Sequence, residues 1–247
     1  MQLAVLYDIH GNLPALEAVI AEVRRDGIDR IVFGGDIVPG PMPRETIDYL
    51  RALHIGADYI RGNGDREILE RLRGQETSAV PEAFRESMRW NARQLGPDDE
   101  RWIAAWPLTL RLDVPSLGPV LFCHATPHSD TPIFTRDTAD ERVSELLQGI
   151  DAPFIVCGHT HMQFDRRVGA TRIVNAGSVG MPFGDPGAYW LSLGPDVRLR
   201  RTDYDLTSAA ERIRKTAYPQ AAMFAAQNVL QPPSEAQMRA AFGGARA

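Results

Sequence analysis

Residues 3–12 read Leu-Ala-Val-Leu-Tyr-Asp-Ile-His-Gly-Asn, an apolar stretch of strand length that runs directly into a turn with carboxylate and imidazole side chains. Residues 154–161, Phe-Ile-Val-Cys-Gly-His-Thr-His, repeat this junction much later in the chain. Three further apolar stretches lead into Asp36, Asn63 and His124. The strand ends of an α/β sheet open into one crevice, and imidazole together with carboxylate is typical of metal ligation. The sequence therefore predicts one site assembled from five strand ends.

The composition limits the class of protein. The chain has 247 residues, of which 44% are hydrophobic, and a formal net charge of −5, which suits one large α/β domain or two small ones. No apolar stretch approaches the ~20 residues of a membrane span, and the acidic balance does not favour nucleic acid as an obligatory partner. Two cysteines cannot form a disulfide framework. We expect Cys123 and Cys157 to be buried free thiols, and we expect a cytoplasmic protein without a membrane partner.

The order of the expected elements indicates the architecture. In the first third, strands at residues 3–7, 30–33 and 57–60 alternate with helices that begin near Leu13 and Pro43, which implies a parallel sheet. After the second histidine-rich turn, four short strands follow one another closely and favour antiparallel hairpins. The prediction is an α/β fold of two sheets stacked face to face, with helices outside.

The remaining segments are predicted to be helical. Residues 65–105 have a helical pattern broken by glycines, and with the 126–136 loop they are expected to form the walls of the pocket. The main domain is expected to span residues 1–205. Residues 206–247 are expected to be a C-terminal helical extension that packs on this domain.

The polar turns occur in a defined order: Asp-x-His, Gly-Asp, Gly-Asn, a lone His and Gly-His-x-His. In this order they resemble the motifs of the calcineurin-like metallophosphoesterase superfamily. The matching stretches are Asp8-Ile9-His10-Gly11-Asn12, Gly35-Asp36-Ile37-Val38, Gly62-Asn63-Gly64-Asp65, His124-Ala125-Thr126-Pro127 and Gly158-His159-Thr160-His161. Residues 175–180, Asn-Ala-Gly-Ser-Val-Gly, are similar to a segment of its small bacterial and archaeal phosphodiesterase branch. The resemblance spans residues 1–205 and implies a four-layer αββα sandwich of two mixed β-sheets flanked by helices.

The resemblance also implies a centre for two divalent transition metals. One metal would take Asp8, His10, Asp36 and His161, and the other would take Asp36, Asn63, His124 and His159, with Asp36 as the bridge. Two cations about 3.5–4 Å apart need a shared anion between them. A metal-bridging hydroxide would be the nucleophile of a phosphoesterase reaction. Mixed nitrogen and oxygen ligands suit manganese, iron, zinc or nickel, and we favour manganese.

The chain departs from the family pattern at Gly64, where the family has a histidine thought to stabilise the transition state or to protonate the leaving oxygen. This departure favours a phosphodiesterase, with Asp36 and His128 as catalytic candidates. His128 would replace the missing acid, or it is a surface-loop histidine. The alternatives are a phosphomonoesterase acting on protein, nucleotide or dinucleoside polyphosphate, and a non-catalytic scaffold of the same fold.

Four residues are candidates for binding a small phosphate-ester substrate. They are Asn12, Asn63, Arg66 and Asn175. Asn12 would contact the phosphate or cap the following helix, and Arg66 would pair with phosphate oxygens or form a salt bridge. Asp130 is treated as a surface charge. The sequence leaves the oligomeric state open, with a homo-oligomer as one alternative.

Overall fold

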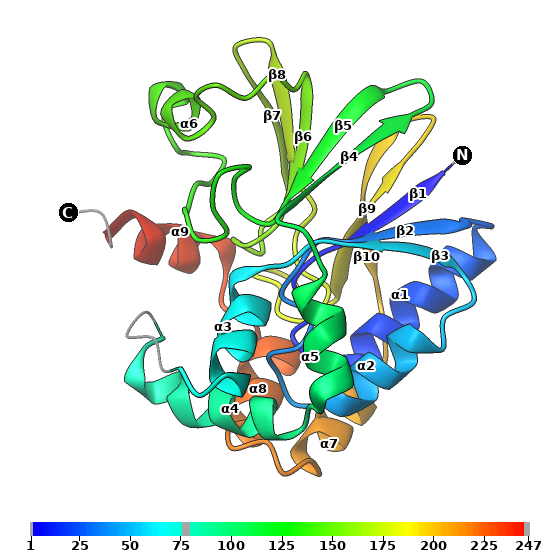
Figure 1. Cartoon of the computed structure of the whole chain (residues 1–247), viewed down its shortest axis with the longest axis vertical. Helices are drawn as coiled ribbons and strands as arrows, with labels where there is room; N and C mark the ends of the chain where they lie inside the picture. The colour runs from blue at the N-terminus through cyan, green and yellow to red at the C-terminus, as the bar shows by residue number, and fades with distance from the viewer. Residues whose placement is uncertain (1, 76–79, 245–247) are drawn as a thin grey trace.

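The computed structural model describes residues 2–75 and 80–244, and in these residues two five-stranded mixed sheets stack face to face (Figure 1). The first sheet has the order β10-β9-β1-β2-β3, with β10 (Val197–Thr202), β9 (Ala188–Leu193), β1 (Leu3–Leu6), β2 (Arg30–Phe33) and β3 (Gly56–Tyr59). The second has the order β4-β5-β6-β8-β7, with β4 (Thr109–Val114), β5 (Gly118–Cys123), β6 (Phe154–Cys157), β8 (Thr171–Asn175) and β7 (Phe164–Val168). The predicted pair of stacked sheets is confirmed.

The first sheet is parallel at its centre. β1 pairs in parallel with β2, and β2 with β3, while β9 runs antiparallel to β1. The helices α1 (Leu13–Arg25) and α2 (Pro43–Arg51) connect the parallel strands and cover the outer face of this sheet. Because β1 is buried on both faces, its sequence is apolar without alternation, as expected for a central parallel strand.

A second apolar core lies between the sheets. It joins Val5 and Tyr7 from the first sheet to Phe122 and Val156 from the second, and the Tyr7 hydroxyl donates a hydrogen bond across the layer to the carbonyl of Val156 at 3.0 Å. The helix α6 (Asp140–Leu146) covers the outer face of the second sheet. The layers are therefore helix, sheet, sheet, helix, as predicted.

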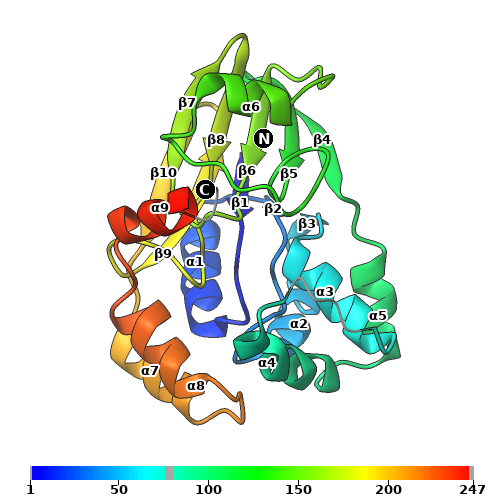
Figure 2. The ribbon, with the colours of Figure 1, turned by 90° about the vertical axis from the view of Figure 1, so that its left-hand side faces the viewer.

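Two groups of helices flank the carboxyl ends of the strands (Figure 2). One group is α3 (Asn63–Leu72), α4 (Glu82–Arg93) and α5 (Pro97–Ala104). The other comes from the C-terminal segment and comprises α7 (Leu206–Arg214), α8 (Ala221–Phe224) and a π-helix, η1 (Ala225–Leu230). The sequence predicted a helical extension here, and within it residues 225–230 adopt π geometry, which is rare and is often found at functional sites.

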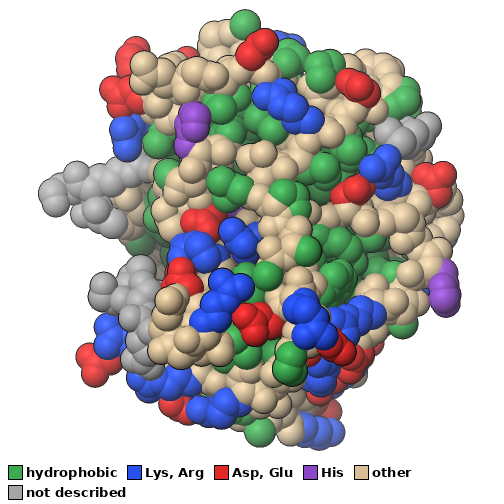
Figure 3. Space-filling model, viewed as in Figure 1, with side chains coloured by type: hydrophobic (Ala, Val, Ile, Leu, Met, Phe, Trp, Pro, Cys, Tyr) green, Lys and Arg blue, Asp and Glu red, His purple; other side chains and the backbone are tan. Residues whose placement is uncertain are grey.

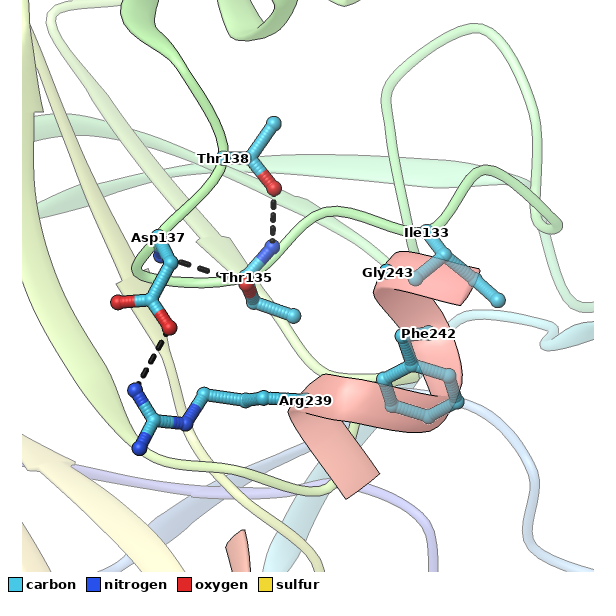
Figure 4. Close-up of a pocket in the computed structure, with 7 residues that line it drawn as sticks. All are labelled: Ile133, Thr135, Asp137, Thr138, Arg239, Phe242 and Gly243. Carbon is cyan, nitrogen blue, oxygen red and sulfur yellow. Dashed lines mark hydrogen bonds and ion pairs between the residues drawn. The ribbon is translucent and has the colours of Figure 1, made fainter. Parts of the chain in front are cut away.

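The last described helix, α9 (Glu235–Gly244), lies against the loop between β5 and α6. Arg239 donates to Asp137 at 2.6 Å, and Arg136 pairs with Glu235 at 2.9 Å. Figure 4 shows the small hollow of about 170 Å³ beneath this contact, with Phe242 at one end. Among the described residues, no helix has the length and apolar character needed to cross a membrane. Both cysteines are buried and unpaired.

Candidate metal centre

The backbone is strained at most of the predicted ligands. Within residues 2–75 and 80–244, six non-glycine residues have a positive φ, which is uncommon for L-residues. Five of them are predicted metal ligands, namely Asp8, His10, Asp36, His159 and His161, with φ between 48° and 65°. Such strain persists where the surrounding structure enforces it and is concentrated at functional sites.

The first group of ligand atoms combines the turn after β1 with the turn after β6. His161 Nε2 lies 3.3 Å from Asp8 Oδ1, and His10 Nε2 lies 3.8 Å from the same oxygen. The two imidazole nitrogens are 3.3 Å apart. Three potential ligands from segments about 150 residues apart are thus within reach of one ion.

The second group adds the turns after β2 and β5. His124 Nε2 lies 3.8 Å from Asp8 Oδ1 and 3.6 Å from Asp36 Oδ1. The other oxygen of Asp36, Oδ2, lies 3.8 Å from His10 Nε2 in the first group. Asp36 therefore spans both groups, and Asp8 also belongs to both.

Three of the histidines are oriented by their other ring nitrogen. In each case Nδ1 lies against a backbone carbonyl oxygen and is thereby assigned as the protonated nitrogen. The pairs are His10 with Pro39 at 3.2 Å, His124 with Gly34 at 3.0 Å and His161 with Met181 at 2.6 Å. This leaves Nε2 unprotonated and directed into the cluster, as in metal sites where the far nitrogen fixes the ring.

Several inward-facing atoms in the described structure lack any hydrogen-bond partner although they are buried. They include Asp8 Oδ1, Asn63 Oδ1 and His124 Nε2. Buried polar atoms without partners are rare and call for a specific explanation. Asp8 Oδ1 and His124 Nε2 are 3.8 Å apart and fit a bound cation, and Asn63 lines the pocket beside His10 and Asp36. His159 is placed differently, since its Nε2 lies 3.1 Å from the carbonyl of Thr131. Because Nε2 is in contact with that carbonyl, only Nδ1 remains for a metal. The ring of His159 is close to the other ligands, with its centroid 5.1 Å from that of His124.

The electrostatics favour positive charge at the centre. Burial raises the pKa of Asp36 to about 6, and the nearby charge of Asp8 adds to the shift. Burial opposes ionisation of Asp8, but His161 and His124 hold the pKa of that carboxyl below its usual value. In return, and against burial, Asp8 and Asp36 raise the pKa of His124, and Asp8 raises that of His161. Burial lowers the pKa of His10 to about 3.

One buried carboxylate ties two ligand turns together without pointing at the cluster. Asp65 Oδ1 accepts hydrogen bonds from the amides of Ile37 and Val38 at 3.0 and 3.1 Å, and its Oδ2 accepts one from Gly62 at 3.1 Å. The turn that carries Asp36 is thereby fixed to the turn that carries Asn63. Sequence reasoning assigned Asp65 no role, although its place in the Gly-Asn-x-Asp motif was the available signal.

Two predicted substrate ligands have structural partners instead. Asn12 is fully buried, accepts from the amide of Ala15 at 3.3 Å and donates to the carbonyl of Gly180 at 2.9 Å. It therefore caps the helix, which is one of the two roles predicted for it, and it also links two loops. Asn175 donates to the carbonyl of Gly158 at 2.6 Å and so holds the Gly-His-Thr-His turn.

The structure also gives the partners of Arg66 and His128, and it shows that the expectation of a surface charge at Asp130 is wrong. Arg66 is bound by Asp130 at 2.8 Å and by Glu70 at 2.9 Å, so its guanidinium is occupied by carboxylates and not directed at a phosphate. Asp130 is 7% exposed and is not a surface charge. His128 is exposed, and its Nε2 lies 2.9 Å from the carbonyl of Gln148 beyond α6, which is the position of a surface-loop histidine.

The position of the missing family histidine is filled by other groups. A Cβ at Gly64 would lie 2.6 Å from Pro39 Cγ and 3.0 Å from Asp36 Oδ1. The amide of Gly64 donates to Asp36 Oδ1 at 2.7 Å. Gly64 therefore permits the close approach of α3 to the ligand turn after β2.

The chain is similar to proteins from archaea and bacteria. It is 26% identical over 243 residues to the uncharacterized protein MJ0912 of Methanocaldococcus jannaschii, covering 88% of this chain and 94% of that protein. A metallophosphoesterase of Sphaerobacter thermophilus has a similar structure, with a TM-score of 0.72, 26% identity and coverage of 93% of this chain and 99% of that one. The hypothetical protein PH1004 of Pyrococcus horikoshii OT3 shares the fold, with a TM-score of 0.76, 20% identity and coverage of 91% and 97%.

A family model for the calcineurin-like phosphoesterase superfamily domain matches residues 1–193. These residues contain all of the ligand turns described above. The chain therefore belongs to the calcineurin-like phosphoesterase superfamily, a family of metal-dependent hydrolases of phosphoric esters.

Proposed function

We propose that this chain is a phosphodiesterase that uses two divalent metal ions, manganese in our preferred assignment, to hydrolyse a small phosphoric diester. The observation that carries the proposal is the span of Asp36, whose two oxygens lie 3.8 Å from His10 Nε2 and 3.6 Å from His124 Nε2. One carboxylate is thereby offered to two groups of histidines at once, which is the arrangement that two neighbouring cations require.

The proposed ligands divide between the two positions. The first position would be held by Asp8, His10, Asp36 and His161, and the second by Asp36, Asn63, His124 and His159. Bound there, the metals would supply a water of lowered pKa and positive charge for the phosphoryl oxygens. The protein's contribution is to keep the ligand atoms directed inward through carbonyl contacts at Nδ1. The neutral oxygen of Asn63 adds a ligand without adding negative charge.

The preference for a diester rests on charge and on Gly64. The described residues that line the pocket beside the cluster include Asp36 and Glu67 but no lysine or arginine. A monoester dianion carries one more negative charge than a diester and would find no side-chain cation there to offset it. The histidine that the family has at position 64 is also absent, and Pro39 occupies its space.

The test uses purified protein stripped with a chelator and reloaded with manganese. We expect about two metals per chain and faster hydrolysis of bis-p-nitrophenyl phosphate than of p-nitrophenyl phosphate. Asp36→Asn should lose nearly all turnover, whereas Asp58→Asn, which removes a surface partner of Arg30, should keep it. A clear excess of monoester hydrolysis would identify a phosphomonoesterase, and metal binding without turnover would identify a scaffold.

A further inference from the structure

The pocket beside the metal centre has an unusual second half. Its cavity of about 400 Å³ is within the range of roughly 300–1,000 Å³ that holds drug-sized ligands. One end contains His10, Asp36 and Asn63. The other end lies between α4 and the C-terminal segment α8–η1. The C-terminal extension thus adds a wall that the sequence did not predict, while the 126–136 loop contacts His159 through the Thr131 carbonyl.

Apolar side chains dominate this far end. They include Val80, Phe84, Met88, Met181, Met223 and Phe224. Phe84 is 46% exposed and Met223 is 38% exposed. Among the described residues, three large apolar side chains are exposed, and these are two of them. Exposed apolar groups facing a pocket from two separate helices mark a binding surface, and methionine adapts to ligands of varied shape.

Positive charge is missing from the same walls. The surface over the helical end of the molecule carries many basic side chains next to acidic ones (Figure 3). Two arginines on α3 are in ion pairs, Arg66 with Asp130 and Arg73, at its C-terminal end, with Glu100. Among the described lining residues, Asp36 and Glu67 are the charged groups, apart from the titratable His10. A polyanionic substituent would therefore be repelled here, whereas a neutral apolar one would be accommodated.

The two walls are joined on one side, which gives the far end a defined shape. The Gln220 side chain donates to the carbonyl of Ala83 at 2.9 Å, and the rings of Trp90 and Tyr218 meet edge to face at 5.5 Å. The C-terminal segment is thereby connected to α4 at the mouth of the pocket.

Building on the proposed function, we propose that this chain hydrolyses diesters in which one ester arm is a large apolar alkyl or aryl group seated between Phe84 and Met223. Nucleoside polyphosphates and phosphopeptides are disfavoured, because their additional charges would enter an uncompensated apolar space. The apolar half of the pocket selects the substrate, and the metal half performs the reaction.

The experiment compares methyl, butyl and octyl p-nitrophenyl phosphate, which share one leaving group, with the manganese-loaded enzyme. We expect kcat/KM to rise about tenfold or more from methyl to octyl, since one well-placed methylene in an apolar pocket changes the ratio by roughly tenfold or more. Phe84→Ser and Met223→Gln should lower kcat/KM for the octyl ester more than for the methyl ester, and so flatten this rise, with the unfolding midpoint close to wild type. Leu199→Ala, on β10 outside the pocket, removes the third exposed apolar side chain as a matched control.

The outcomes separate the two proposals. If no diester is hydrolysed with bound metal, the proposed function fails. If the methyl and octyl esters react equally well, or if thymidine p-nitrophenyl phosphate is preferred over the octyl ester, the function stands and the apolar-arm proposal is overturned. The same holds if Leu199→Ala flattens the rise as much as the pocket variants do.

Discussion

Removing the Asp65 carboxylate should break the hydrogen bonds that hold two metal-ligand turns in place. Asp65 is fully buried and accepts three backbone amides, from Ile37, Val38 and Gly62, at 3.0 to 3.1 Å. An unpaired buried donor costs about 1–3 kcal/mol, so Asp65→Ala orphans three donors and should cost about 3–9 kcal/mol. We expect the lower half of this range, because water can enter the vacated space. The loss is large against a typical total stability of about 5–15 kcal/mol.

Asp65→Asn should be milder for a reason visible in the geometry. Its oxygen can still accept from Ile37 and Val38, while its NH₂ group faces the amide of Gly62 and leaves a single donor unpaired, at about 1–3 kcal/mol. Urea unfolding gives the free energies, and manganese titration by calorimetry gives the metal affinity, which should weaken in the order Asn then Ala. The control Asp58→Asn removes a half-exposed ion pair with Arg30 and should cost below about 1 kcal/mol. The reasoning is refuted if Asp65→Ala loses less than the control while binding metal normally.

Three further outcomes are expected. The pKa of Asp36 is raised to about 6, and its proton must leave before a metal binds, so the affinity for manganese should fall as the pH drops below about 6. Calorimetry in buffers of different ionisation enthalpy should show proton release on binding, and a pH-independent affinity would contradict this prediction. His128→Ala should leave kcat and KM unchanged, since the ring contacts the carbonyl of Gln148, and a drop beyond tenfold in kcat would restore its role as an acid. Phe183→Ala removes the ring that is stacked on His161 at a centroid distance of 5.1 Å, and it should weaken metal binding about 10- to 100-fold. Competition with a metallochromic chelator measures the affinity, and a wild-type value would show that the stacking does not support the ligand.

The fold could be predicted well from the sequence because its strands are short apolar runs with polar turns behind them. Val5 and Val156 lie in such runs, and both occupy the layer between the sheets. The ligand turns were predictable for the same reason, since each follows the carboxyl end of a strand. Motif order then indicated which turns converge, although Asp8 and His159 are 151 residues apart and are joined by a hydrogen bond from the His159 amide to Asp8 Oδ2 at 2.9 Å.

The roles of the neighbouring polar residues could not be predicted because their partners are distant and mostly carry no side-chain signal. Asn12 reaches the carbonyl of Gly180, which lies 168 residues away, and any residue type at that position would offer the same carbonyl. Arg66 meets Asp130 from another layer of the structure. The pocket wall formed by residues 221–230 was missed for a related reason, since an alanine-rich helical pattern does not indicate what the helix faces.

The glycine at position 64, where the family has a histidine, is linked to the positions of Pro39 and Asp36. A side chain at this position would meet Pro39, whose ring is held close because the carbonyl of the same residue lies 3.2 Å from His10 Nδ1. Gly64 in turn uses its amide to orient Asp36, the carboxylate that spans both histidine groups. Position 64 thus acts on the metal ligands through the backbone, and a histidine placed there would have to displace the contacts that orient His10 and Asp36. The geometry of the centre therefore leaves no room for that histidine. For this reason we count its absence in favour of the proposed diester hydrolysis.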